Sequence, residues 1–124
     1  MNHELAKQLQ DNVHRFYKEQ GAWFATTRGK LMPEQTFVSE HIRPGMTVAD
    51  VGAGNGRFAK LLPKNIHYIG IDPSETLRRS TSLLETPSSS LIPGSLPHLP
   101  LPDQRVDVTV CLAVLHHIPS DIER

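Results

Sequence analysis

The sequence predicts an α/β fold built on a parallel sheet, and two observations carry the prediction. From Met46 onward, short apolar or β-branched runs alternate with helical segments across short links. The run 106–112 is almost wholly apolar, which is typical of a parallel strand buried on both faces. We therefore expect a Rossmann-like parallel sheet with helices on both faces. It is incomplete at about four strands and is preceded by an N-terminal helical cover.

The N-terminal segment shows helical periodicity in place of this alternation. One apolar face predicts a helix over 3–19 with Gly21 just beyond its end, and its residues are Leu5, Leu9, Val13, Phe16 and Tyr17. An irregular connector follows over 23–29, and Pro33 can open a second helix over 33–41. We expect residues 1–45 to form the helical cover and 46–124 the Rossmann-like, cofactor-binding half-domain of one structural unit.

The second part of the chain divides into strands and helices in turn. We expect strands over 47–51, 66–71 and 106–112, helices over 56–62 and 73–84, and at most a brief strand near 90–92. The segment that holds this brief strand contains five prolines, which cannot donate to a sheet ladder.

Composition excludes several classes of protein. The 124 residues suit one domain, and the 13 basic and 13 acidic side chains argue against a nucleic-acid surface built from bulk charge. The single cysteine, Cys111, excludes an internal disulfide framework and a cysteine-rich zinc site. No apolar run reaches the length of a membrane span, and the N-terminus does not resemble a secretory signal. We expect a soluble, cytoplasmic protein with no membrane partner.

A glycine-rich turn follows the strand 47–51. Gly52, Gly54 and Gly56 let the chain turn tightly and let a ligand approach main-chain N–H groups. Asp72 ends the next strand, and adjacent parallel strands bring their carboxyl ends together. A carboxylate there can accept both hydroxyls of a ribose, so the pair predicts an adenosine-containing ligand. A glycine turn without a ligand is the alternative.

Asp50 decides between two such ligands. The spacing Gly54-x-Gly56-x-x-Ala59 formally satisfies a dinucleotide fingerprint. A carboxylate at Asp50 would repel a pyrophosphate, whereas it would attract an ammonium and a sulfonium. The pattern favours S-adenosylmethionine over NAD.

Four ordered segments resemble the class I S-adenosylmethionine-dependent methyltransferases of the type 11 group. They are Val48–Gly56, Tyr68–Ser74, Leu99–Val108 and Cys111–Ile118. Within the group, Phe24–Arg28, Pro33-Glu34 and the paired histidines are similar, more weakly, to relatives of the tRNA wobble-uridine methyltransferases.

The resemblance implies roles for individual residues. The methionine end of the cofactor would lie against Asp50, Gly52, Ala53 and Gly54, and its ribose would bind Asp72. The adenine would lie beside Pro73 and Ser74, and its edge would face Ser95 and Leu96. The carbonyls of Cys111 and Ala113 would lie near the cofactor amino group. Ser95 departs from the aspartate that many relatives carry, so it offers adenine a neutral, shorter acceptor.

For two further residues, a role in the site and a role outside it both stay open. Arg28 could reach the cofactor carboxylate or be a solvated loop arginine. His116, the one tentative catalytic residue, could border the methyl-acceptor pocket or be exposed before the next helix. Adjacent side chains diverge, so His116 and His117 do not suggest a metal site.

The expected function is methyl transfer from S-adenosylmethionine to an unidentified acceptor, for which a small molecule, a tRNA base and a protein side chain stay open. The rivals are a non-catalytic S-adenosylmethionine-binding or partner module and an NAD-dependent oxidoreductase. The sheet of this family has seven strands and only four fit here. Three explanations compete: a fragment of a longer gene, which we favour, self-association through the exposed edge of 106–112, or a degenerate module.

Overall fold

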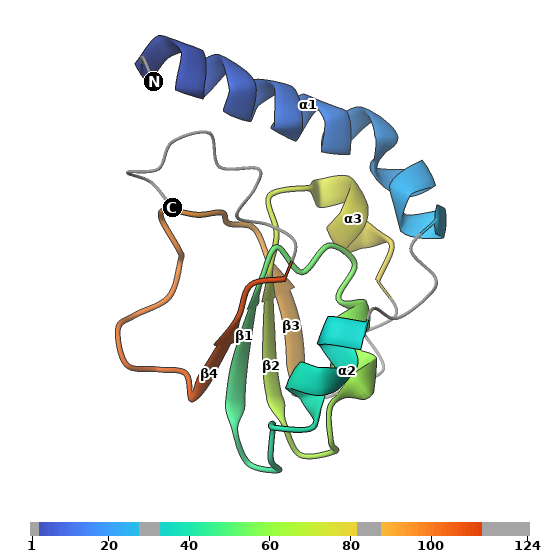
Figure 1. The fold of residues 1–124 in the computed structure, drawn as a ribbon, viewed down its shortest axis with the longest axis vertical. Coiled ribbons are helices and arrows are strands. Elements are labelled where there is room, and N and C mark those ends of the chain that lie inside the picture. Colours follow the sequence, from blue (N-terminus) through green and yellow to red (C-terminus); the bar gives the residue numbers. More distant parts are fainter. Residues whose placement is uncertain (1–2, 28–32, 82–87, 113–124) are drawn as a thin grey trace.

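A four-stranded, all-parallel sheet lies at the centre of the computed structural model, which describes residues 3–27, 33–81 and 88–112 (Figure 1). Its strand order is β3-β2-β1-β4. The strands are β1 (Thr47–Val51), β2 (His67–Ile71), β3 (Ser89–Ile92) and β4 (Val108–Val110). The predicted fold class, a Rossmann-like parallel sheet behind an N-terminal helix, is confirmed.

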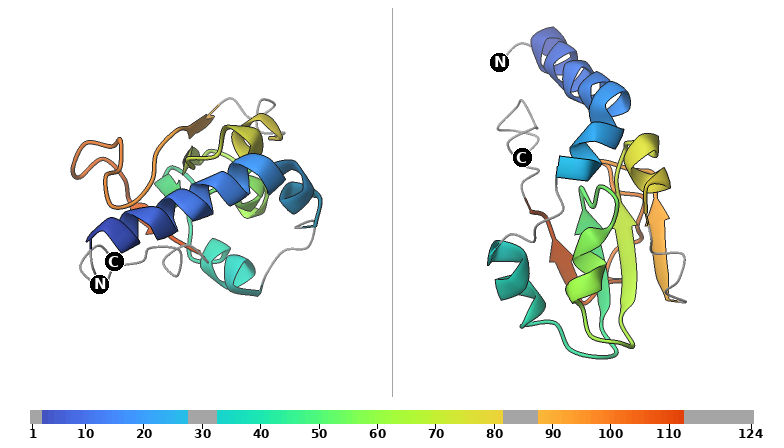
Figure 2. Two further views of the ribbon diagram at one scale, coloured as in Figure 1. Left: turned by 90° about the horizontal axis from the view of Figure 1, so that it is seen from above. Right: turned by 90° about the vertical axis from the view of Figure 1, so that its right-hand side faces the viewer.

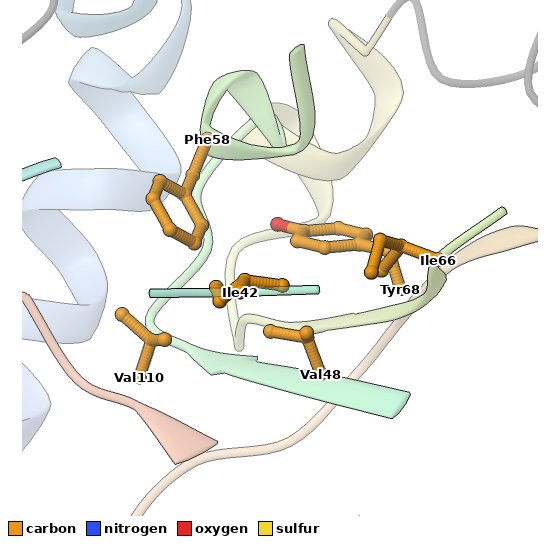
Figure 3. Packing of buried hydrophobic residues seen from close by; sticks show 6 residues of the cluster. All are labelled: Ile42, Val48, Phe58, Ile66, Tyr68 and Val110. Atoms are coloured by element: carbon orange, nitrogen blue, oxygen red, sulfur yellow. The ribbon is translucent and has the colours of Figure 1, made fainter. Parts of the chain in front are cut away.

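Both faces of the sheet are buried, as its apolar strands predict. Successive side chains of a strand point to opposite faces. On one face, Val48, Tyr68 and Val110 pack in a cluster with Ile42, Phe58 and Ile66 (Figure 3). On the other face, Ala49, Val51 and Ile71 are buried. The core therefore leaves little choice of register, because a shift by one residue would exchange the two faces.

Helices lie on the sheet and across its upper end. On the face of the cluster, α2 (Pro33–Ser39) packs beside η1 (Arg57–Leu61), a 3₁₀ helix. The short α3 (Glu75–Arg79) follows β2, and α1 (His3–Thr27) packs on it. Figures 1 and 2 show α1 lying across the carboxyl ends of the strands. No described helix is long and apolar enough to cross a membrane.

The sequence predicted that the first helix ends before Gly21, but α1 continues through Gly21 to Thr27. Residues 23–27 are therefore helical instead of irregular. Gly21 lies where α1 meets α3: a Cβ at this position would lie 3.2 Å from the Cβ of Thr76. A glycine within a helix costs about 1 kcal/mol relative to alanine. Here its missing side chain lets two helices approach closely, and this tertiary contact overrides the local signal to stop.

Several predicted elements are shorter in the structure. The helix expected over 56–62 is the 3₁₀ helix η1, which follows Gly56 in a left-handed conformation. The helix expected over 73–84 is α3, which begins at Glu75 and ends at Arg79, and the strand expected over 106–112 is β4, of three residues. The helix expected over 33–41 ends at Ser39. The brief strand predicted near 90–92 is confirmed as β3.

β4 lies at one edge of the sheet within the described residues, where it pairs with β1. Its start is held by Asp107, which exchanges bonds with Thr47: the Asp107 N–H donates to the Thr47 carbonyl at 2.9 Å, and Asp107 Oδ2 accepts from the Thr47 N–H at 2.7 Å.

The division of the chain into a helical cover and a cofactor-binding half-domain at residue 45 stays a prediction.

Gly94 supplies a test of the packing beyond β3. A Cβ at Gly94 would lie 2.7 Å from Cδ of Pro100 and 2.8 Å from Cγ2 of Ile71. The proline ring and the buried isoleucine cannot yield easily, so we expect Gly94→Ala to lower the free energy of unfolding by about 1–3 kcal/mol. Urea unfolding measures the change. The matched control is Ser90→Ala on the exposed side of β3. A Gly94 variant as stable as that control would contradict the close packing.

Candidate functional site

The candidate site lies at the carboxyl ends of β1 and β2, where the glycine turn and Asp72 meet. Gly52, Gly54 and Gly56 all adopt positive φ, at 76°, 60° and 78°. Side chains rarely tolerate this conformation, so three glycines here satisfy a demand of the backbone. The tight turn predicted from the sequence is therefore present.

The N–H groups of this turn are bonded within the protein. Those of Gly52 and Ala53 both donate to the Ile71 carbonyl, at 2.8 and 3.1 Å. That of Gly54 donates to Asp72 Oδ2 at 2.9 Å. We expected these donors to face a ligand, and the structure instead uses them to fasten the turn to the end of β2. A pyrophosphate bound here would find them already engaged.

The carboxylate of Asp72 accepts hydrogen bonds both from the glycine turn and from Ser74. Its Oδ1 accepts the N–H of Ser74 at 2.8 Å while Oδ2 accepts that of Gly54. The carboxylate is buried, which raises its pKa, and the two backbone bonds and the charge of Arg78 oppose that rise. An ionised carboxylate offers about four lone-pair sites, so two bonds leave acceptor capacity.

Asp50 is buried at the end of β1, beside the turn. Its Oδ2 accepts a 2.6 Å hydrogen bond from the hydroxyl of Tyr68. Burial raises the pKa of Asp50 to about 6; the Tyr68 bond and the charge of Arg57 lower it, and the charge of Asp72 raises it. Burial and the Asp50 charge raise the pKa of the Tyr68 phenol, so the phenol stays protonated and is the donor. The site thus holds a carboxylate that lacks its ordinary solvation.

Cys111 lies close enough for the Asp50 charge to act on it. The thiol is half-buried, and burial first and the Asp50 charge second raise its pKa. A protonated thiol is a poor nucleophile. Cys111 therefore lies beside the site without reactive chemistry of its own.

The middle of α1 covers this end of the sheet. The Ser74 hydroxyl donates to the Tyr17 carbonyl and the Thr76 hydroxyl to the Lys18 carbonyl, each at 3.4 Å. The charge of His14, also on α1, lowers the pKa of Asp72. The helical cover thus lies over the acidic group that the sequence assigned to a ribose.

The structure brings most of the predicted site residues together. Ser74 is the N-cap of α3 and accepts the Leu77 N–H at 3.2 Å, while Pro73 is exposed. Ser95 and Leu96 follow β3, whose Ile92 carbonyl accepts the Asp72 N–H at 3.1 Å. Their turn therefore begins at the same end of the sheet.

Three predicted residues, Arg28, Ala113 and His116, lie outside the described residues. Among those the structure describes, no group of three or more acidic, histidine or cysteine side chains could hold a metal ion.

Three residues of the site were not predicted from the sequence: Tyr68, Arg57 and Arg78. Arg78 Nη1 donates to the backbone carbonyl of Asp72 at 2.6 Å. Tyr68 alternates onto the same sheet face as Asp50, but that relation follows only from the strand register, which the structure supplies. The two arginines had no signal in the sequence either, since their roles depend on where the short helices η1 and α3 begin.

The sequence of the chain is similar to those of known proteins. Residues 49–124 match the family model described as a methyltransferase domain. The chain is 31% identical over 112 residues to the tRNA (carboxymethyluridine(34)-5-O)-methyltransferase of Schizosaccharomyces pombe, covering 90% of the chain and 47% of that protein. It is 32% identical over 114 residues to the enzyme of the same name from Saccharomyces cerevisiae, covering 92% of the chain and 40% of the relative. The chain thus spans less than half the length of these relatives.

Solved structures support the same fold. A SAM-dependent methyltransferase from Aquifex aeolicus superposes with a TM-score of 0.58 at 23% identity, over 73% of this chain and 53% of that one. At this identity the likeness shows the fold. The matched family model covers more than half of the chain, including the glycine turn and Asp72. The chain belongs to the methyltransferase-domain family, in the S-adenosylmethionine-dependent class that its motifs resemble.

Proposed function

We propose that this chain binds S-adenosylmethionine at the carboxyl ends of β1 and β2 and serves methyl transfer to a tRNA carboxylate. One observation carries the binding proposal: the buried carboxylate of Asp50 lies beside a glycine turn whose N–H donors are already engaged. Such a site offers negative charge and few donors, so it suits a cationic ligand better than a phosphate.

Asp50 would face the methionine end of the cofactor. S-adenosylmethionine carries an ammonium and a sulfonium, and either charge attracts a carboxylate more strongly where water is excluded. The raised pKa of Asp50 records the cost of burying its charge, which the charge of Arg57 offsets only in part. A cationic ligand offsets that cost, whereas the pyrophosphate of NAD adds a second negative charge.

Asp72 would bind the ribose. Its remaining lone pairs can accept the two hydroxyls while Gly54 and Ser74 hold the carboxylate in place. Pro73 and Ser74 beside the adenine, and Ser95 and Leu96 at its edge, complete the proposed pocket. Gly52 and Ala53 shape it, and Cys111 lies next to Asp50. The roles of Arg28, Ala113 and His116 rest on the resemblance.

The acceptor class comes from the relatives, whose names specify a carboxymethyluridine of tRNA. When bound, the cofactor supplies an activated methyl group, and the electron pair of the broken C–S bond stays on sulfur. A carboxylate acceptor is already ionised near neutral pH, so no residue of the chain has to remove a proton from it. Catalysis then consists mainly of positioning, which can supply about 7–11 kcal/mol, and it does not require His116 as a base.

Two further expectations remain part of this proposal. The location of β4 at the sheet edge of the described residues supports pairing through that edge, with a second copy or another strand. A cytoplasmic location fits the single cysteine.

The first prediction concerns ligand binding. We expect S-adenosylhomocysteine, but not NAD, to bind the chain in isothermal titration calorimetry. Asp72→Ala removes the ribose acceptor and should cost about 1.5–3 kcal/mol of binding free energy, because bonds to charged groups have that size. Asp103→Ala, at an exposed aspartate, is the matched control. Equal affinity in the folded Asp72 variant and the control would refute the ribose assignment, and NAD binding alone would favour the oxidoreductase.

The second prediction concerns Asp50 and pH. Its pKa in the folded state, about 6, lies above the ordinary value of 3.8, so the folded state binds the proton more tightly. Stability from this group is therefore present below about pH 4 and lost as pH rises through 6. Asp50→Asn cannot ionise. The free energy of unfolding of Asp50→Asn, measured relative to that of wild type, should rise by on the order of 2–3 kcal/mol from pH 4 to pH 7. The affinity of the variant for S-adenosylhomocysteine should be lower than that of wild type.

Urea unfolding at both pH values measures that rise in the free energy of unfolding, with Asp103→Asn as the control. A stability difference that stays constant between pH 4 and 7 would contradict a titrating, buried Asp50.

The third prediction concerns the acceptor. With methyl-labelled S-adenosylmethionine, we expect the chain to label tRNA that carries carboxymethyluridine at the wobble position and not the same tRNA with plain uridine. The label should be released by mild alkali, since the product is a methyl ester. Binding of S-adenosylhomocysteine without any labelling would instead support the non-catalytic module. Equal labelling of both tRNAs would exclude the carboxylate as the acceptor.

A further inference from the structure

We propose that Tyr68 is a positioning residue of the cofactor site, which orients the Asp50 carboxylate and keeps it ionised for a cationic ligand. The inference rests on the proposed binding function of Asp50. The phenol engages Oδ2 of Asp50, and we assign Oδ1 to the ligand ammonium.

The sheet register places the two residues for this contact. Tyr68 of β2 lies opposite Val48 of β1, and Asp50 lies two residues farther along the same face. Diagonal neighbours of this kind on adjacent strands are about 7–8 Å apart, a distance that an aromatic side chain can span. The hydroxyl reaches Asp50 Oδ2 at 2.6 Å, a length typical of a charge-assisted bond.

Packing fixes the phenol independently of this bond. The Tyr68 ring is 2% exposed and belongs to the cluster with Ile66 and Phe58 (Figure 3). Because the core determines where the ring lies, the hydroxyl is held at the end of β1 whether or not a ligand is bound. A donor held in this way orients the carboxylate before binding and lowers the cost of ordering it afterwards.

Tyr68 acts on Asp50 through a hydrogen bond, whereas the other groups around Asp50 act through their charges. Asp72 disfavours ionisation of Asp50, Arg57 favours it, and the nearby Cys111 thiol is protonated. The phenol bond also favours the ionised form while adding no charge of its own. Removing the hydroxyl alone should therefore raise the pH at which Asp50 becomes available to a cation.

The test is the pH dependence of S-adenosylhomocysteine affinity between pH 5 and 8, measured by calorimetry on wild type and Tyr68→Phe. Affinity should rise with pH as Asp50 ionises. In the variant the midpoint of that rise should lie at higher pH, with roughly a tenfold loss of affinity near pH 6. Tyr17→Phe removes the same atom from the only other tyrosine and is the matched control, expected to keep the wild-type midpoint.

An unchanged midpoint in Tyr68→Phe would overturn the inference, and so would an equal loss of affinity at every pH, which a merely structural role produces. Wild type that binds no S-adenosylhomocysteine would overturn the proposed function, and this inference with it. If Tyr68→Phe does not fold, 3-fluorotyrosine at residue 68 in the Tyr17→Phe background preserves the shape and makes the phenol a stronger donor. Its midpoint should move to lower pH, and a midpoint that stays in place would overturn the inference.

Discussion

Three backbone N–H groups of the glycine turn, donating to the Ile71 carbonyl and the Asp72 carboxylate, fasten the end of β1 to the end of β2. The rest of the site depends on this connection. Two of the three donors, Gly52 and Gly54, adopt positive φ, a backbone conformation that residues with side chains rarely tolerate. The connection also holds the Asp72 carboxylate between Gly54 and Ser74, so the residue assigned to the ribose is fixed by the fold before any ligand arrives.

The same connection determines the electrostatic character of the site. With the turn's donors engaged, little in the turn compensates the charge of a phosphate, and the charge of the buried Asp72 disfavours ionisation of the buried Asp50. A buried charge costs stability, which proteins tolerate mainly where a ligand offsets that cost. The expected gain in stability on neutralising Asp50 and the expected loss of ligand affinity are thus two consequences of one buried charge.

The helical cover adds a second constraint on access. α1 packs on α3 through Gly21 and Thr76, and its backbone carbonyls accept hydroxyl bonds from Ser74 and Thr76. At 3.4 Å these bonds are long, so the close approach of the two helices at Gly21 contributes the more specific contact. Asp72 is consequently covered by a helix that belongs to the N-terminal segment and not to the sheet.

The fold class, the glycine turn and the location of Asp50 and Asp72 could all be predicted from the amino-acid sequence, because alternating apolar runs and local turn chemistry act over a few residues. The sequence also predicted the brief strand β3 between prolines. The lengths of the elements could not be predicted in the same way. Gly21 resembles a helix end in the sequence, and only the packing of α3 against it explains why α1 continues. The helix after the turn is a 3₁₀ helix. Only the tertiary structure brought Tyr68 to Asp50 and directed the turn's donors to β2, since both depend on strand register, which joins residues 18 apart in the chain.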